Sequence, residues 1–181
     1  MRIRAITDIE TGGFSQSRSA LVEIAFLLID DNYEIIDQFT TLVLPYHQRQ
    51  SAELMEYSPG AEAVHGYSLD TLRKQGMAPV KICEEVDSLL DRFNVTEFIG
   101  HNIHKFDRPR LVEFWDRFSN FDASKRFDVT IDTMVAAKQQ INAQSYALEN
   151  LCHGLGIVHE GAHTAGGDCM ATLQLAKYLE L

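Results

Sequence analysis

Apolar residues in the first quarter of the chain follow the spacing of β-strands. Residues 3–7 are apolar and partly β-branched, residues 21–29 form a longer, largely apolar run, and residues 33–44 resume a β-rich run. Such runs are typical of strands, and the near-continuous apolar character of the second predicts burial on both faces. Turn residues Asp30 to Asn32 predict a hairpin between the second and third runs. The sequence therefore predicts three antiparallel strands at the start of the chain.

After this β-rich region, apolar residues recur three or four positions apart, which is the spacing of amphipathic helices. Ser68 is expected to cap the first of these helices, and Ser145 the fifth, which should end just before Gly154. The spacing and the capping residues predict helices over residues 68–74, 80–93, 109–118, 133–141, 146–153 and 169–179.

Two further short strands are predicted between the helices, over residues 97–100 and 127–131. Strands that alternate with helices need crossover connections, so they should join the first three in a mixed sheet with helices on its faces. No Pro-, Gly- or Ser-rich linker divides the chain. We expect one α/β domain spanning residues 1–181.

Composition and charge argue against a membrane-spanning protein and against a basic duplex-binding protein. The chain is 45% hydrophobic and 23% charged, which is ordinary for a globular protein, and it contains no apolar run long enough to cross a membrane. Its net charge of −10 argues against non-specific duplex binding through a broad basic surface. Three widely spaced cysteines and the absence of room for a secretory signal predict reduced thiols and a cytoplasmic location.

The first candidate for chemistry is the acidic pair Asp8 and Glu10, at the junction of the first strand and a turn ending in Gly12 and Gly13. Residues two apart on a strand share one face, so the two carboxylates should point the same way. Solvated turn acids are the alternative. The adjacent glycines would let backbone approach a ligand closely, although glycines also simply make turns.

Two later segments carry similar groups. Asp107 follows a short strand and precedes a helix, where an Asp is also favoured as a cap. His163 lies in a loop of small residues and could serve as a base near neutral pH, although most such histidines are surface residues. Asp168 opens the last helix and could be only a cap. His101 and His104 are ambiguous and receive no metal role.

Taken together, the three segments resemble the DEDDh, or DnaQ-like, family of 3′–5′ exonucleases. Asp8 and Glu10 match its first motif, Asp-x-Glu-Thr, and Asp107 matches the second. His163 and Asp168 match the third, whose histidine marks the DEDDh branch. Segments that also look similar to the family extend over nearly the whole chain, at residues 58–66, 132–133, 145–151 and 168–173.

This resemblance implies a ribonuclease-H-like fold and two Mg²⁺ or Mn²⁺ ions. It implies that Asp8 bridges the ions, that Glu10 and Asp168 complete the shell of the first, and that Asp107 acts mainly through metal-bound water. His163 would accept the proton of the attacking water. Paired hard cations suit phosphodiester hydrolysis, and carboxylate oxygens are ligands that they prefer.

The resemblance also implies where the substrate binds. Thr11, Gly12 and Asn102 would contact the terminal nucleotide, and Phe14 is a weaker candidate for packing against its base. Family members often carry Thr or Ser at the position of Gly12, which leaves the choice between DNA and RNA open.

The leading hypothesis is a 3′–5′ exonuclease that releases 5′-mononucleotides from single-stranded or frayed 3′ ends. DNA is favoured because the chain is similar to the epsilon-type proofreading domain of bacterial DNA polymerase III. An exoribonuclease resembling ribonuclease T or oligoribonuclease is the nearest alternative, and a non-catalytic polymerase-associated module is a third.

The partner expected is the 3′ end of a single-stranded nucleic acid, and no membrane is expected to take part. The chain ends at Leu181, directly after the last helical pattern. We therefore expect no C-terminal polymerase-binding tail and a freestanding enzyme, or one recruited through its folded surface.

Overall fold

The computed structural model describes residues 2–181, and its centre is a five-stranded sheet with the order β3-β2-β1-β4-β5. β1, β2 and β3 pair antiparallel, whereas β4 pairs parallel with β1 and with β5. The predicted mixed sheet, with its three antiparallel strands first, is confirmed. The strands are β1 (Arg4–Thr11), β2 (Leu21–Ile29), β3 (Ile35–Leu42), β4 (Glu97–Gly100) and β5 (Val129–Asp132).

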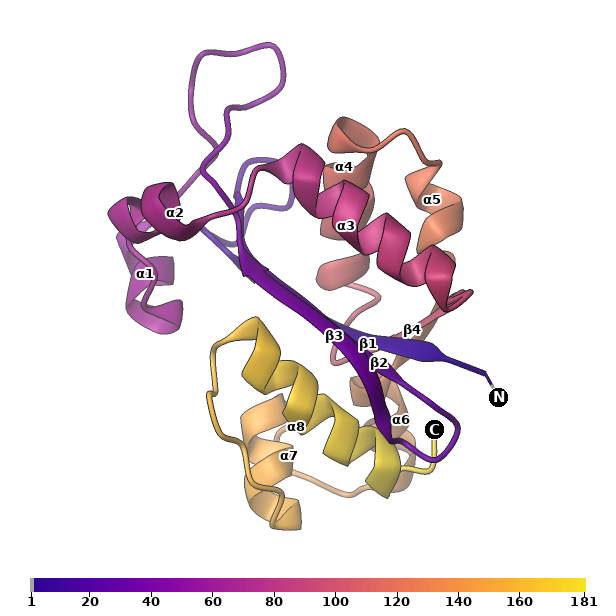
Figure 1. Ribbon diagram of the computed structural model, residues 1–181. Coiled ribbons are helices and arrows are strands. Elements are labelled where there is room, and N and C mark those ends of the chain that lie inside the picture. The colour runs from indigo at the N-terminus through magenta and orange to yellow at the C-terminus, as the bar shows by residue number, and fades with distance from the viewer. Residues whose placement is uncertain (1) are drawn as a thin grey trace.

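Helices cover both faces of this sheet. Figure 1 shows α3, α4 and α5 on the upper side of the strands and α7 and α8 on the lower side, with α1 and α2 beyond one end. The helices of the described chain are α1 (Pro59–His65), α2 (Leu69–Gln75), α3 (Pro79–Arg92), α4 (Asp107–Phe118), α5 (Ala123–Arg126), α6 (Thr133–Gln140), α7 (Leu148–Leu155) and α8 (Ala165–Tyr178).

The two-sided cover explains the apolar character of β2, all of whose residues are buried. Alternate side chains of a strand point to opposite faces. Phe26 and Leu28 belong to the core under α3 and α4, which also holds Trp115. Ala25 and Leu27 pack in the second core, beneath α8. The apolar residues of β2 on both faces therefore have a core to enter.

Several predicted elements agree with the structure. The strand over residues 97–100 is confirmed as β4, and Ser68 is the N-cap of α2, where its side chain accepts the Thr71 amide. The helix predicted over residues 80–93 is confirmed as α3, within one residue at each end.

The helix predicted over residues 146–153 is wrong at both ends. α7 begins at Leu148 after Ala147, which makes no side-chain capping bond, so Ser145 is not its N-cap. The carbonyl of Tyr146 instead accepts a hydrogen bond from His101 at 2.8 Å, which holds this residue outside the helix. Gly156, with φ of 68°, ends the helix in place of Gly154.

The first strand is longer than predicted. β1 continues to Thr11, so Asp8 and Glu10 lie within a strand and not in a turn. Pairing with β2 as far as residue 11 accounts for the extension. The short helices α1 and α5 had no predicted counterpart.

The state of the cysteines and the character of the helices complete the description of residues 2–181. Cys83, Cys152 and Cys169 are free and buried, in agreement with the expectation of reduced thiols. Among residues 2–181, no helix combines the length and apolar character required to traverse a bilayer.

Candidate metal centre

The acidic pair of β1 lies on the side of the sheet that α8 covers. Ile6 packs into the core beneath α8. Because strand side chains alternate, Asp8 and Glu10 share that face with Ile6. The prediction that the two carboxylates share a face is met by the strand, and the packing of α8 places that face toward the last helix.

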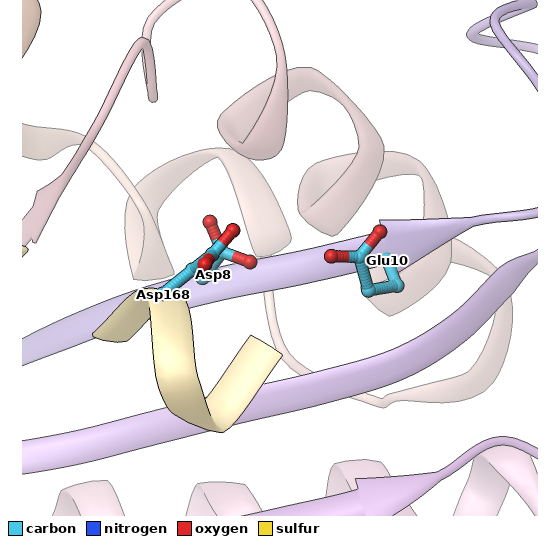
Figure 2. Close-up of side chains that lie close together, drawn as sticks. All are labelled: Asp8, Glu10 and Asp168. Atoms are coloured by element: carbon cyan, nitrogen blue, oxygen red, sulfur yellow. The ribbon is translucent and has the colours of Figure 1, made fainter. Parts of the chain in front are cut away.

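Asp168 lies in the first turn of α8, across from the pair. One oxygen each from Asp8, Glu10 and Asp168 can be chosen so that all three lie within 4.8 Å of one another. Figure 2 shows Asp8 and Glu10 on β1, with Asp168 reaching toward Asp8 from the helix. The N-cap of α8 is Thr164, whose side chain accepts the Gly167 amide, so Asp168 does not cap this helix.

Asp107 is buried beside these three residues but lies outside the 4.8 Å cluster. The parallel pairing of β1 with β4 brings the ends of both strands to one edge of the sheet, where α4 begins. Asp107 is the first residue of α4 and makes no capping bond. Its Oδ1 atom is buried and has no hydrogen-bond partner in the described chain. The capping alternative therefore does not account for this residue.

Burial and mutual repulsion raise the pKa values of these acids. Burial raises the pKa of Asp8 well above its usual range, and the charges of Asp107, Asp168 and Glu10 raise it further. Burial, followed by the charges of Asp168 and Glu23, raises the pKa of Glu10 to about 8.

The pKa of Asp107 rises to about 7, because burial outweighs the backbone amides and the Arg110 charge that lower it. Two ionised carboxylates at the cluster's separation repel by about 3 kcal/mol at an effective dielectric of about 20. The repulsion between these carboxylates favours the uptake of protons or cations at the site.

Glu23 is an additional acid at this site that the sequence analysis missed. It lies directly opposite Glu10 in the β1–β2 pairing and is 6% exposed. Its Oε2 atom accepts the backbone amide of Ala165 at 2.8 Å, which fastens the start of α8 to the sheet. A lone glutamate in an otherwise apolar strand was the signal that could have identified it.

The segment after Glu10 presents an exposed aromatic side chain on a tightly packed turn. Thr11 is buried, and its hydroxyl donates to the Gly13 carbonyl at 2.8 Å. A Cβ at Gly12 would lie 2.1 Å from the Glu56 carbonyl oxygen. A Thr or Ser at this position would therefore require this backbone to move. Phe14 is 96% exposed and is free to contact a ligand.

Asn102 lies in the loop after β4, with a φ of 63°. Its backbone amide donates to Asp132, which also receives the His104 amide and caps α6. Both ring nitrogens of His101 have protein partners, Thr133 and Tyr146. His101 therefore connects the loop after β4 to Thr133 and Tyr146 and lies outside the acidic cluster.

The two histidines before α8 occupy different environments. His163 is exposed, has a φ of 64°, and its side chain makes no hydrogen bond within residues 2–181. His159, which the sequence analysis did not single out, is 10% exposed and places Nε2 2.6 Å from Oδ1 of Asp168.

The donor set suits hard divalent cations. The clustered ligand atoms are carboxylate oxygens, which Mg²⁺ and Mn²⁺ prefer to sulfur. The unpartnered Oδ1 of buried Asp107 supplies a further oxygen donor beside the cluster. Asp8, Glu10 and Asp168, with Asp107 next to them, are thus the residues that could hold such cations.

Comparison with known structures shows the fold. Escherichia coli exonuclease I in complex with a dT13 oligonucleotide superposes with a TM-score of 0.80 at 22% identity, over 98% of this chain and 41% of that chain. The zinc-bound form of the E. coli exonuclease I–single-stranded DNA complex gives a TM-score of 0.79 at 21% identity, over 98% and 40%. The predicted ribonuclease-H-like fold is confirmed.

Sequence comparison shows the family. The PolC-type DNA polymerase III of Thermotoga petrophila is 25% identical over 171 residues, which are 94% of this chain and 11% of that protein. The chain thus spans about a tenth of this relative and about two fifths of the exonuclease I chains. The exonuclease family model RNase_T matches residues 5–176. The chain therefore belongs to this family of DnaQ-like exonucleases, hydrolases of phosphodiester bonds that use divalent metals.

Proposed function

We propose that this chain is a 3′–5′ exonuclease that removes 5′-mononucleotides from single-stranded or frayed DNA with the help of two Mg²⁺ or Mn²⁺ ions. The observation that carries the proposal is the convergence of Asp8, Glu10 and Asp168 from the two ends of the chain. Repelling buried carboxylates destabilise a fold unless protons or cations neutralise them, and a cation site gives them a function.

In this proposal Asp8, Glu10 and Asp168 hold the cations, and Asp107 contributes its unpartnered oxygen. When bound, paired divalent cations activate water and neutralise charge on the phosphoryl and leaving oxygens. His163 accepts the proton of the attacking water. Its exposed position at the loop before α8 leaves its ring nitrogens available for that task.

Thr11 and the backbone at Gly12 contact the terminal nucleotide in this proposal, and Asn102 borders the same edge of the sheet. Phe14 stacks on a base, a contact that tolerates any sequence because every base has an aromatic face. Its side chain is 96% exposed on a turn anchored by Arg110, which donates to the Phe14 carbonyl at 2.8 Å. The backbone is therefore fixed while the ring remains accessible.

DNA is the proposed substrate because the exonuclease I structures with this fold hold dT13 and single-stranded DNA. An exoribonuclease is the second candidate, because Gly12 lies at the proposed contact with the terminal ribose and offers no side chain that selects DNA over RNA.

The test is hydrolysis of matched DNA and RNA oligonucleotides, labelled so that the released product is identified, with Mg²⁺ or Mn²⁺ and with a chelator. We expect 5′-mononucleotides from the 3′ end, faster turnover of DNA, and no release with the chelator. The Asp8→Asn variant should be inactive on both strands. Faster turnover of RNA would support the exoribonuclease, and no release from either strand would support a non-catalytic module.

A further inference from the structure

The loop between α7 and α8 holds a second histidine close to the acidic cluster. His159 precedes Asp168 by nine residues, and its Nε2 atom lies 2.6 Å from Oδ1 of Asp168. Its side chain is 10% exposed, and that of Asp168 is 17% exposed. His163, four residues later, is exposed instead. The two histidines therefore cannot have the same task.

The backbone of this loop is packed against the first turn of α8, two residues after His159. A Cβ at Gly167 would lie 2.1 Å from the Gly161 carbonyl oxygen, so the two segments touch without intervening side chains. Thr164 closes the turn, because its amide and its hydroxyl both donate to the Gly161 carbonyl. The backbone that connects His159 to Asp168 is therefore fixed against the start of α8 at residues 161–167.

The hydrogen bond leaves Asp168 able to bind a cation. An ionised carboxylate only accepts hydrogen bonds, so Nε2 of His159 is the donor in this contact. His159 engages Oδ1, and Oδ2 remains for a ligand. This hydrogen bond restricts rotation of the carboxylate about its terminal bond, and groups that orient metal ligands typically contribute 10- to 100-fold in metal affinity or activity.

We propose that His159 is a positioning residue that orients the Asp168 carboxylate for divalent-cation binding, a role distinct from that of His163. This inference rests on the proposed metal-dependent function. It concerns how tightly the site holds its cations and involves no contact of His159 with the substrate.

The experiment compares His159→Gln with His159→Asn in the full chain. Gln can place its amide N–H near the position of Nε2, whereas Asn is one methylene shorter and cannot reach Asp168. Mn²⁺ binding is measured by titration calorimetry in the absence of nucleic acid, after circular dichroism has shown that each variant is folded. We expect the dissociation constant of His159→Asn to rise about 10- to 100-fold and that of His159→Gln to stay within about 3-fold of the parent.

Two controls separate positioning from other effects. His153→Ala changes an exposed histidine of α7 and should leave Mn²⁺ affinity unchanged. His163→Ala should also leave the affinity unchanged, since its side chain does not contact the acids. In activity assays, excess Mn²⁺ should restore His159→Asn but not His163→Ala.

Equal Mn²⁺ affinity of the parent, His159→Asn and His159→Gln would overturn the positioning role while leaving the proposed function intact. Equal weakening of both variants would overturn it as well, because it would assign His159 a merely structural role. Failure of the parent chain to bind Mn²⁺ would reject the metal-dependent function and this inference with it.

Discussion

At the scale of single residues, exposure distinguishes the proposed base from the proposed ligands. His163 is exposed and lies outside the cluster of carboxylates, which are half-buried. Substitution of this proposed base by alanine should lower the rate constant of the hydrolysis step by about 10²- to 10⁴-fold, the usual contribution of a general base, with Mn²⁺ affinity preserved. Single-turnover hydrolysis of labelled DNA measures the rate. A variant with the parental rate would remove His163 from the mechanism.

The close packing around Gly12 predicts how a substitution there changes the stability of the protein. A methyl group there would meet the Glu56 carbonyl oxygen at 2.1 Å, and backbone at that position has little room to yield. We expect Gly12→Ala to lower the free energy of unfolding by about 1–3 kcal/mol, as overpacked substitutions do. Urea unfolding measures this quantity.

The matched control for that substitution is Gly154→Ala. Gly154 lies within α7, and a Cβ there would meet nothing within 4 Å. Because alanine favours the helix more than glycine does, the control should be neutral or stabilise the protein by up to about 1 kcal/mol. Similar losses in both variants would show that close packing at Gly12 is not the cause.

At the scale of elements, Asp132 links the end of β5, the start of α6 and the loop after β4. Its carboxylate caps α6 by accepting the amides of Met134 and Val135, and it also accepts those of Asn102 and His104. Loss of a cap costs about 1 kcal/mol, and the loop amides add a similar amount. Asp132→Ala should therefore lower the free energy of unfolding by about 2–3 kcal/mol and speed amide exchange in residues 102–106.

Asp132→Asn is the matching variant. Three of the four amides donate to Oδ1, which an asparagine side-chain oxygen can replace. It should retain most of the stability that Asp132→Ala loses. Equal losses in the two variants would contradict the assigned hydrogen-bond geometry.

The errors in predicted elements have a common cause in tertiary contacts. Ser145 has the chemistry of an N-cap, yet its hydroxyl accepts the side-chain amide of Asn150 at 2.8 Å and α7 starts later. The ring of His101, 45 residues earlier in the sequence, donates a hydrogen bond to the Tyr146 carbonyl, so Tyr146 lies outside the helix. Local capping preferences cannot include such a partner, because it lies in another part of the sequence.

At the scale of the whole molecule, the buried acids predict how stability depends on pH. Without divalent cations, the folded-state pKa of Glu10 is raised to about 8 and that of Asp107 to about 7. The folded protein therefore binds more protons than the unfolded chain between about pH 4 and pH 8. Its free energy of unfolding should fall as pH rises through this window, and the full penalty applies above it.

Thermal unfolding at several pH values in the presence of a chelator checks this expectation. Glu10→Gln removes one of the raised carboxyls and should flatten the pH dependence. Mg²⁺ or Mn²⁺ should raise Tm most at pH 8, because a ligand that binds only the folded state stabilises it by mass action. A Tm that changes with neither pH nor cation concentration would contradict the electrostatic repulsion inferred between these acids.

The mixed sheet, and the shared face of its first two acids, follow from the sequence alone. Strand periodicity places Asp8 and Glu10 on one face, and this relation holds whether the strand ends at residue 7 or at Thr11. The shared face is a local property that the alternation of side chains along a strand sets, so the spacing of the two residues in the sequence is enough to predict it.

The tertiary structure alone decided which groups meet that pair. Glu23 and His159 carried no motif, yet the pairing of β1 with β2 and the packing of the loop before α8 place them at the acids. Asp168 joins Asp8 across 160 positions, since α8 folds back over the sheet to cover its apolar face. Contacts at such separations depend on how whole elements pack, a quantity that local residue patterns do not contain.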